Sequence, residues 1–116
     1  MHLVPADRAD RHTIDGHRVC EAIEGIGETA AVQAWAQRFA LLADPGRLSL
    51  LLALRAAPDL CVSDLATATG MNDPATSQAL RLLRVAGVVT AHKDGRIIRY
   101  RITDEHTLAL LPTATP

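Results

Sequence analysis

Residues 60–85 read "LCVSDLATATGMNDPATSQALRLLRV" and form the most informative part of the chain. The pattern predicts two short helices, over residues 62–69 and 74–85, separated by "GMND". Gly70 suits the C-terminal end of the first helix, and Asp73-Pro74 suits the start of the second. Asp59 or Ser63 could cap the first helix. A short helix, a tight turn and a second helix make the helix-turn-helix pattern.

The segments before this stretch predict further helices. "GHRVCEAIEGI" could form a short helix capped by Asp15, and "ETAAVQAWAQRFALLA" reads as a longer one with apolar residues at helical spacing. That apolar stripe consists of Val32, Trp35, Ala36, Phe39 and Ala40. "DPGRLSLLLALRAAP" predicts a helix with Asp44 as its N-cap and Pro45 at its first position. Its expected buried face is Leu48, Leu51, Leu52 and Leu54.

The segments after it predict a hairpin and a last helix. In "GVVTAHKDGRIIRYRI", Asp94-Gly95 is a hairpin signal, and apolar residues alternate with Arg99 and Arg101. "DEHTLALL" predicts a helix with Asp104 near its start. The predicted fold class is therefore mainly α with a β-hairpin wing, a winged helix-turn-helix. We expect an N-terminal arm over 1–20, the winged helix-turn-helix domain over 21–112, and a tail over 113–116.

Length and composition exclude several classes of protein. The chain has 116 residues and 48% hydrophobic content, which suits one folded domain. Its apolar runs are far shorter than the roughly 20 residues that span a bilayer, and the N-terminus lacks the pattern of a secretory signal. Two cysteines make no disulfide framework. We expect a cytoplasmic protein with no membrane partner.

Charge is segregated along the chain although the net charge is only −1. Residues 1–30 hold six acids against three arginines. Residues 76–101 hold six bases against Asp94 alone: Arg81, Arg84, Lys93, Arg96, Arg99 and Arg101. A local basic surface can neutralise phosphates whatever the net charge, although such clusters are often no more than solvated faces.

The chain resembles the ArsR/SmtB family of bacterial metal-sensing winged-helix repressors. Four segments show the resemblance, in the family's order: "LLADPGRLSLLLAL", "LCVSDLATATGM", "ATSQALRLLRVAGVV" and "KDGRIIRYRITDEH". The resemblance implies a dimeric winged helix-turn-helix, with residues 21–112 as the DNA-binding and dimerisation domain. Its homodimers would place two reading helices in successive major grooves of a palindromic operator. It also implies that the metal-free protein represses and that metal binding lowers operator affinity. One departure is Gln78, where many members have His.

The second helix of the helix-turn-helix and the wing supply the candidate DNA contacts. Thr76, Ser77, Gln78 and Arg81 occupy early turns of the reading helix, where side chains reach base edges. Gln pairs well with adenine and Arg with guanine. Arg84, Arg96, Arg99 and Arg101 are expected to contact phosphates and to position the protein.

Cys61 and Asp64 match the family's Cys and Asp at the start of the helix-turn-helix, one helical turn apart. In the family, ligands from the partner's N-terminal arm complete this site, and here the arm offers His17 and Cys20. Two thiolates, one imidazole and one carboxylate suit tetrahedral Zn²⁺, the expected effector, and also Cd²⁺; Ni²⁺ or Co²⁺ is an alternative. Ser63 replaces a second thiol found in some relatives, which argues against a thiolate-only site. The alternative role for both cysteines is that of small buried hydrophobes.

A second family site is represented by only half of its ligands. Asp104 and His106 match an Asp-x-His pair, but no His and acid follow in "LLPTATP". A helix cap and a surface histidine are therefore the favoured roles of this pair, although His12 or His2 could replace the missing half. His92 is expected to be solvated or to contact phosphate.

Three alternative functions compete with a metal-responsive repressor. Cys20 and Cys61 could form a disulfide or capture arsenite, although arsenite prefers three thiolates. The chain could be a dimeric interaction module without DNA binding, which Gln78, Arg81 and the basic wing oppose. An enzyme with a Cys61 nucleophile is disfavoured, because no phosphate loop, nucleophile elbow or acid pair accompanies that cysteine.

Overall fold

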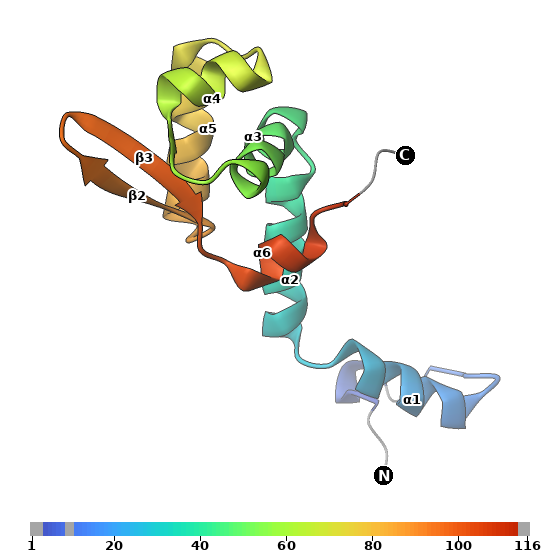
Figure 1. Cartoon of the computed structure of the whole chain (residues 1–116). Coiled ribbons are helices and arrows are strands. Elements are labelled where there is room, and N and C mark those ends of the chain that lie inside the picture. The colour runs from blue at the N-terminus through green and yellow to red at the C-terminus, as the bar shows by residue number, and fades with distance from the viewer. Residues whose placement is uncertain (1–3, 9–10, 114–116) are drawn as a thin grey trace. The chain divides into compact units, whose positions relative to one another are not determined.

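The computed structural model describes residues 4–8 and 11–113, and the chain divides into two compact units, Met1–Gln37 and Arg38–Pro116. The first unit contains the 3₁₀ turn η1 (Ala6–Arg8) and helix α1 (Gly16–Ile26). Helix α2 (Thr29–Leu42) begins in the first unit and ends in the second. The rest of the second unit is three helices, a small sheet and a final short helix (Figure 1).

Helix α1 begins and ends where the sequence predicts. Asp15 occupies the N-cap position, but its side chain makes no capping hydrogen bond. At the other end Gly27 has a φ of 77° and donates its N–H to the Ile23 carbonyl at 3.2 Å. A positive φ costs glycine little, so this residue ends the helix without strain.

Helix α3 (Pro45–Ala56) supplies the centre of the core. The Asp44 carboxylate accepts a hydrogen bond from the Arg47 N–H at 2.9 Å, which confirms the predicted cap. Of the predicted buried leucines, Leu51 and Leu54 are buried, whereas Leu48 and Leu52 are half-buried at the edge of the core. The prediction missed Leu50, which is fully buried.

Helices α4 (Val62–Thr69) and α5 (Asp73–Val85) form the predicted helix-turn-helix. Gly70 ends α4 in the left-handed conformation, at a φ of 77°, and its N–H donates to the Ala66 carbonyl. Asn72, rather than Asp73, caps α5: its side-chain oxygen accepts from the Ala75 N–H at 2.8 Å. Cys61 occupies the N-cap position of α4 without a side-chain cap, so neither Asp59 nor Ser63 has the predicted capping role.

The wing is an antiparallel pair, β2 (Val89–Asp94) and β3 (Ile97–Ile102). Asp94 pairs with Ile97, so the two turn residues are Gly95, at a φ of 63°, and Arg96. A short strand that the sequence did not predict, β1 (Leu60–Cys61), pairs with the other edge of β3 and gives the order β1-β3-β2.

The core of the second unit lies between the helices and the sheet. Leucines of α3, α4 and α5 pack with Val88, Val89 and Leu111, and Tyr100 and Ile102 cover this cluster from β3. Ile98 is 44% exposed, so it does not pack against the core as the predicted alternation along β3 requires. Helix α6 (Glu105–Leu110) follows the wing and ends before Pro112. Among the described residues, no helix has both the length and the apolar character needed to cross a bilayer.

Candidate functional site

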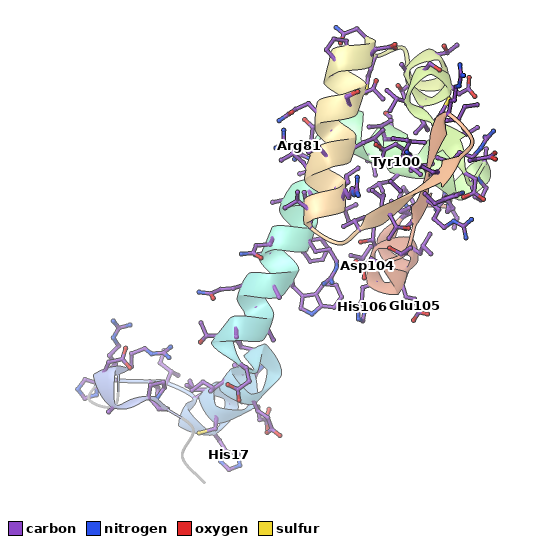
Figure 2. The ribbon with its side chains drawn as sticks, turned by 90° about the vertical axis from the view of Figure 1, so that its left-hand side faces the viewer. His17, Arg81, Tyr100, Asp104, Glu105 and His106 are labelled. Atoms are coloured by element: carbon purple, nitrogen blue, oxygen red, sulfur yellow. The ribbon has the colours of Figure 1, made fainter. Side chains whose placement is uncertain are left out.

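Helix α5 presents most of the predicted DNA-reading residues to solvent. Ser77, Gln78, Arg81 and Arg84 are all exposed, and Arg81 projects from the helix in Figure 2. Neither arginine forms an ion pair with any residue of the described part of the chain. Two uncompensated guanidinium groups and an exposed amide on one helix are the chemistry needed to contact phosphates and base edges.

The structure contradicts the prediction that Thr76 contacts DNA. Its side chain is fully buried, and its hydroxyl donates a hydrogen bond to the Asn72 carbonyl at 2.8 Å. Thr76 therefore stabilises the first turn of α5 from the core side and does not face a base edge. Its position in the sequence correctly places Thr76 on α5, but the side chain lies on the buried face of that helix and not on the exposed one.

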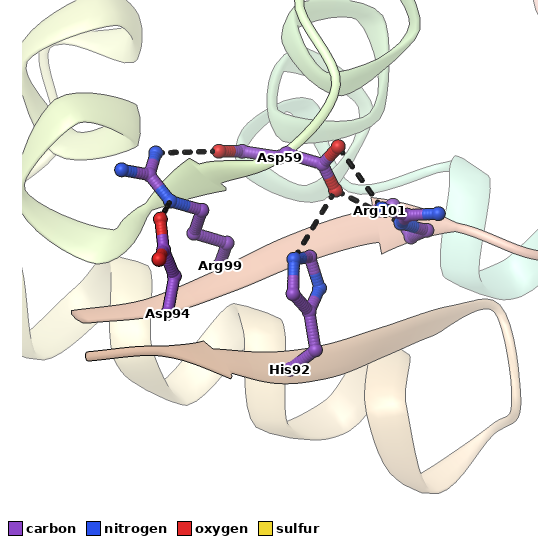
Figure 3. A network of polar contacts seen from close by, with 5 residues as sticks. All are labelled: Asp59, His92, Asp94, Arg99 and Arg101. Carbon is purple, nitrogen blue, oxygen red and sulfur yellow. Dashed lines mark hydrogen bonds and ion pairs between the residues drawn. The ribbon is translucent and has the colours of Figure 1, made fainter. Parts of the chain in front are cut away.

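The wing arginines divide into two kinds. Arg96 lies exposed in the turn, without an ion pair to another described residue. Arg99 Nε donates to Asp94 Oδ2 at 2.8 Å, and Arg101 makes a two-point contact with the Asp59 carboxylate at 2.8 and 3.0 Å (Figure 3). The predicted phosphate contacts of Arg99 and Arg101 thus compete with acids that already hold both side chains.

Asp59 also belongs to this surface, although the sequence does not predict that it forms an ion pair here. It has a φ of 66°, and the carboxylate that could have capped α4 binds Arg101 instead. His92 Nε2 lies 3.8 Å from the same carboxylate, so His92 has a partner in the protein rather than being only solvated. Arg101 and His92 lie 42 and 33 positions after Asp59, so no local sequence pattern could have shown these contacts.

Cys61 and Asp64 lie one turn apart at the start of α4. Cys61 is half-buried with a free thiol, and its Sγ lies 3.3 Å from Ser63 Oγ. Asp64 is exposed and makes no ion pair with another described residue. A thiol and a carboxylate without competing cations can both ligate a divalent metal, so the donor chemistry of this pair fits.

His17 and Cys20 lie three positions apart on α1. His17 is exposed (Figure 2) and Cys20 is half-buried with a free thiol. They belong to the first unit, whereas Cys61 and Asp64 belong to the second. Within residues 4–8 and 11–113 no three His, Cys, Asp or Glu side chains are grouped to hold a metal. Each pair thus offers two ligands, and a complete set would need both pairs.

Asp104 is already engaged within the second unit. Its Oδ2 accepts hydrogen bonds from Thr107 Oγ1 at 2.6 Å and from Arg38 Nε at 3.1 Å. The hydrogen bond from Thr107, and next the Arg38 guanidinium, lower the pKa of Asp104 against the opposing effect of burial. A metal would have to displace a cation that is in place, so Asp104 has a structural role. That role is not the predicted cap, because Asp104 occupies the N-cap position of α6 without a side-chain capping hydrogen bond.

The remaining candidate ligands of this second site are His106, His12 and His2. His106 is exposed on α6 beside Glu105, and His12 is exposed in the first unit. Figure 2 shows His106 on the same short helix that Asp104 precedes. His2 lies outside the described residues. No third ligand for Asp104 and His106 is present in the described chain.

Comparison with known proteins identifies a family model and several relatives. The model described as "Bacterial regulatory protein, arsR family" matches residues 44–91. The HTH-type transcriptional regulator NmtR of Mycobacterium tuberculosis is 45% identical over 89 residues, 77% of this chain and 72% of that protein. A transcriptional repressor SmtB homolog of Synechocystis is 42% identical over 78 residues, 67% of this chain; the chain spans only 58% of that relative's length.

Solved structures show the same fold. The AntR antimony-specific transcriptional repressor matches with a TM-score of 0.68 and 32% identity, over 93% of this chain and 86% of that one. The homodimeric winged helix-turn-helix domain of Mb0332 from Mycobacterium bovis matches with a TM-score of 0.63 and 34% identity, over 73% and 78% of the two chains. These similarities confirm the winged helix-turn-helix predicted from the sequence.

Proposed function

This chain belongs to the ArsR family of bacterial regulatory proteins, and from that membership we propose that it is a metal-responsive transcriptional repressor. It binds a palindromic operator as a homodimer and leaves it when a divalent metal binds. The observation that supports DNA binding most directly is the exposed set Ser77, Gln78, Arg81 and Arg84 on α5. Membership of a family of regulators also confirms that the chain is not an enzyme. A protein that acts on chromosomal DNA works in the bacterial cytoplasm.

A homodimer would explain why the proposed operator is palindromic. The Mycobacterium bovis relative is homodimeric, and two copies of α5 related by a twofold axis would enter major grooves one helical turn apart. Helix α2 exposes large apolar side chains in the single chain: Val32 is 45%, Trp35 40% and Phe39 52% exposed. Apolar groups of this size lose contact with water favourably when a second copy covers them.

The metal site proposed for the switch combines Cys61 and Asp64 of one subunit with His17 and Cys20 of the other. Both cysteines are free, and the donor set suits Zn²⁺ best, with Cd²⁺, Ni²⁺ and Co²⁺ as alternatives. A bound metal would join the arm to the helix-turn-helix. Thiols must lose their protons to ligate, so metal affinity should rise with pH.

Metal weakens operator binding in this scheme only if it binds the DNA-incompatible state of the dimer more tightly. Operator DNA must then weaken metal binding by the same factor. For a coupling free energy of about 1–3 kcal/mol, that factor is about 5–150.

A second candidate keeps the DNA-binding role and changes the effector. The relative named AntR is antimony-specific, and both cysteines of this chain are free thiols. Cys20 and Cys61 could thus bind a trivalent metalloid such as arsenite or form a disulfide. Metal analysis of the purified protein combined with titration of its free thiols separates these effectors.

The first prediction tests base reading by α5. Arg81→Ala should weaken binding to the preferred palindrome by about 1–3 kcal/mol and relax the base preference at one position. Arg84→Ala, at an exposed site on the same helix, should weaken binding to all sequences alike. Fluorescence anisotropy with the palindrome and a scrambled duplex measures both variants. Equal affinity of the wild type for the two duplexes would contradict the proposed function.

A further inference from the structure

Asp59 links the end of α3 to both strands of the wing. It lies between α3 and β1 with a φ of 66°, the one positive φ among the described non-glycine residues. Its N–H donates to the Tyr100 carbonyl at 3.0 Å. Aspartate and asparagine tolerate the left-handed conformation better than other side chains do. The backbone at this position therefore places the carboxylate over the wing at a modest cost.

The Asp59 carboxylate neutralises Arg101. Nε donates to Oδ1 at 2.8 Å and Nη2 donates to Oδ2 at 3.0 Å, a two-point contact of the stronger class of ion pair (Figure 3). Both side chains are partly exposed, 50% for Arg101 and 37% for Asp59. The pair therefore lies at the surface, where a phosphate could otherwise reach the same guanidinium.

Arg99 is held by a second acid, Asp94, and by the backbone carbonyl of Asp59. Asp94 accepts from its Nε at 2.8 Å, and the Asp59 carbonyl accepts from its Nη1 at 3.0 Å (Figure 3). Two of the wing's three arginines thus have fixed acceptors inside the protein. Only Arg96, in the turn, has no such ion pair within the described chain.

We propose that Asp59 restrains the DNA affinity of the wing by holding Arg101 away from phosphates. The inference rests on the proposed DNA-binding function and changes the role expected of this arginine. A phosphate that binds Arg101 must first break a two-point contact with a carboxylate, so the wild-type wing contacts the backbone mainly through Arg96 and Lys93, which are exposed and form no ion pair within the described chain. Asp59 therefore sets how strongly the wing binds DNA of any sequence.

The test is Asp59→Asn. Asparagine keeps the size of the side chain, accepts a positive φ and retains both backbone contacts, with Tyr100 and Arg99. It removes the charge that holds Arg101. On a short duplex of random sequence, the slope of log affinity against log salt should steepen by about 0.9. The ratio of affinities at 50 and 200 mM salt should then grow about 3.5-fold.

Two further variants make the result specific to the ion pair. Glu105→Gln, at an exposed position of α6, changes the net charge equally and should leave the slope unchanged. In the double variant Asp59→Asn/Arg101→Ala the extra slope should disappear. An unchanged or shallower slope in folded Asp59→Asn would overturn the proposal, as would a steeper slope that persists without Arg101. Because the probe is a random duplex, failure to prefer a palindrome would count against the proposed function and not against this inference.

Discussion

Asp104 shows how one side chain can match a family motif and still have a structural role. Thr107 is fully buried, and its hydroxyl donates to Asp104 at 2.6 Å, beside the ion pair with Arg38. Thr107→Val keeps the shape of the side chain and removes the hydrogen bond. We expect a loss of about 1–2 kcal/mol in the free energy of unfolding at pH 7. Thr67→Val is the matched control, because Thr67 is an exposed helix residue that donates only to the Ser63 carbonyl.

The same contact predicts a pH dependence. Because the pKa of Asp104 in the folded protein lies below its ordinary value of 3.8, the ionised carboxylate stabilises the fold. That contribution is complete above the ordinary value and is lost as the pH falls through the lowered pKa. Urea unfolding between pH 7 and pH 3 should show Asp104→Asn less stable than the wild type at neutral pH and the difference shrinking in acid. A constant difference across this range would show that the charge of Asp104 is not what stabilises the fold.

The N-terminus of α5 is stabilised by one capping side chain, the amide of Asn72. The Asn72 side chain accepts from the Ala75 N–H at 2.8 Å, whereas neighbouring Asp73 makes no such cap. Asn72→Ala should lower the free energy of unfolding by about 1 kcal/mol, because an orphan N–H loses its acceptor. Asp73→Ala should cost less, since only its favourable interaction with the helix dipole is lost. Equal losses in denaturant titrations of the two variants would contradict this assignment of the cap.

The sequence predicts the helices of this fold well because their signals are local. The Asp44-Pro45 start, Gly70 and the helix-turn-helix spacing all act within a few residues of the boundaries they define. Strand β1 was missed because two residues become a strand only by pairing with Tyr100 and Arg99, about forty positions away. The hairpin was found, but its turn lies one residue later than the Asp94-Gly95 signal indicates.

The candidate site, like the fold, is predicted from the sequence only where its signals are local. Residue type and order are enough to propose Ser77, Gln78, Arg81, Arg84 and the wing arginines as DNA contacts, but they do not show the acids that pair with Arg99 and Arg101. Thr76 was assigned to DNA because an early helix position does not by itself show which face is buried. The metal ligands remain a prediction, because the two pairs belong to different units and their meeting depends on a second copy of the chain.

In the whole molecule, Cys61 connects the proposed DNA-binding surface to the proposed metal site, which spans two subunits. Cys61 lies at the end of β1 and pairs with Arg99 of the wing, while the helix-turn-helix begins at the next residue. A metal held by Cys61 would therefore act at once on both elements that are proposed to contact DNA. Coupling through this strand requires that metal binding favour one of two dimer states, and the free-energy difference can be measured.

The most direct test is operator affinity with and without Zn²⁺ for the wild type, Cys61→Ser and Asp104→Ala, measured by fluorescence anisotropy at fixed salt. We predict that Zn²⁺ weakens wild-type binding by about 5–150-fold. Cys61→Ser should bind the operator as the wild type does without metal and should not respond to Zn²⁺, because the serine hydroxyl is a poor zinc ligand. Asp104→Ala should keep most of the response. A Zn²⁺ response that survives in Cys61→Ser and is lost in Asp104→Ala would contradict the account and place the sensor at α6.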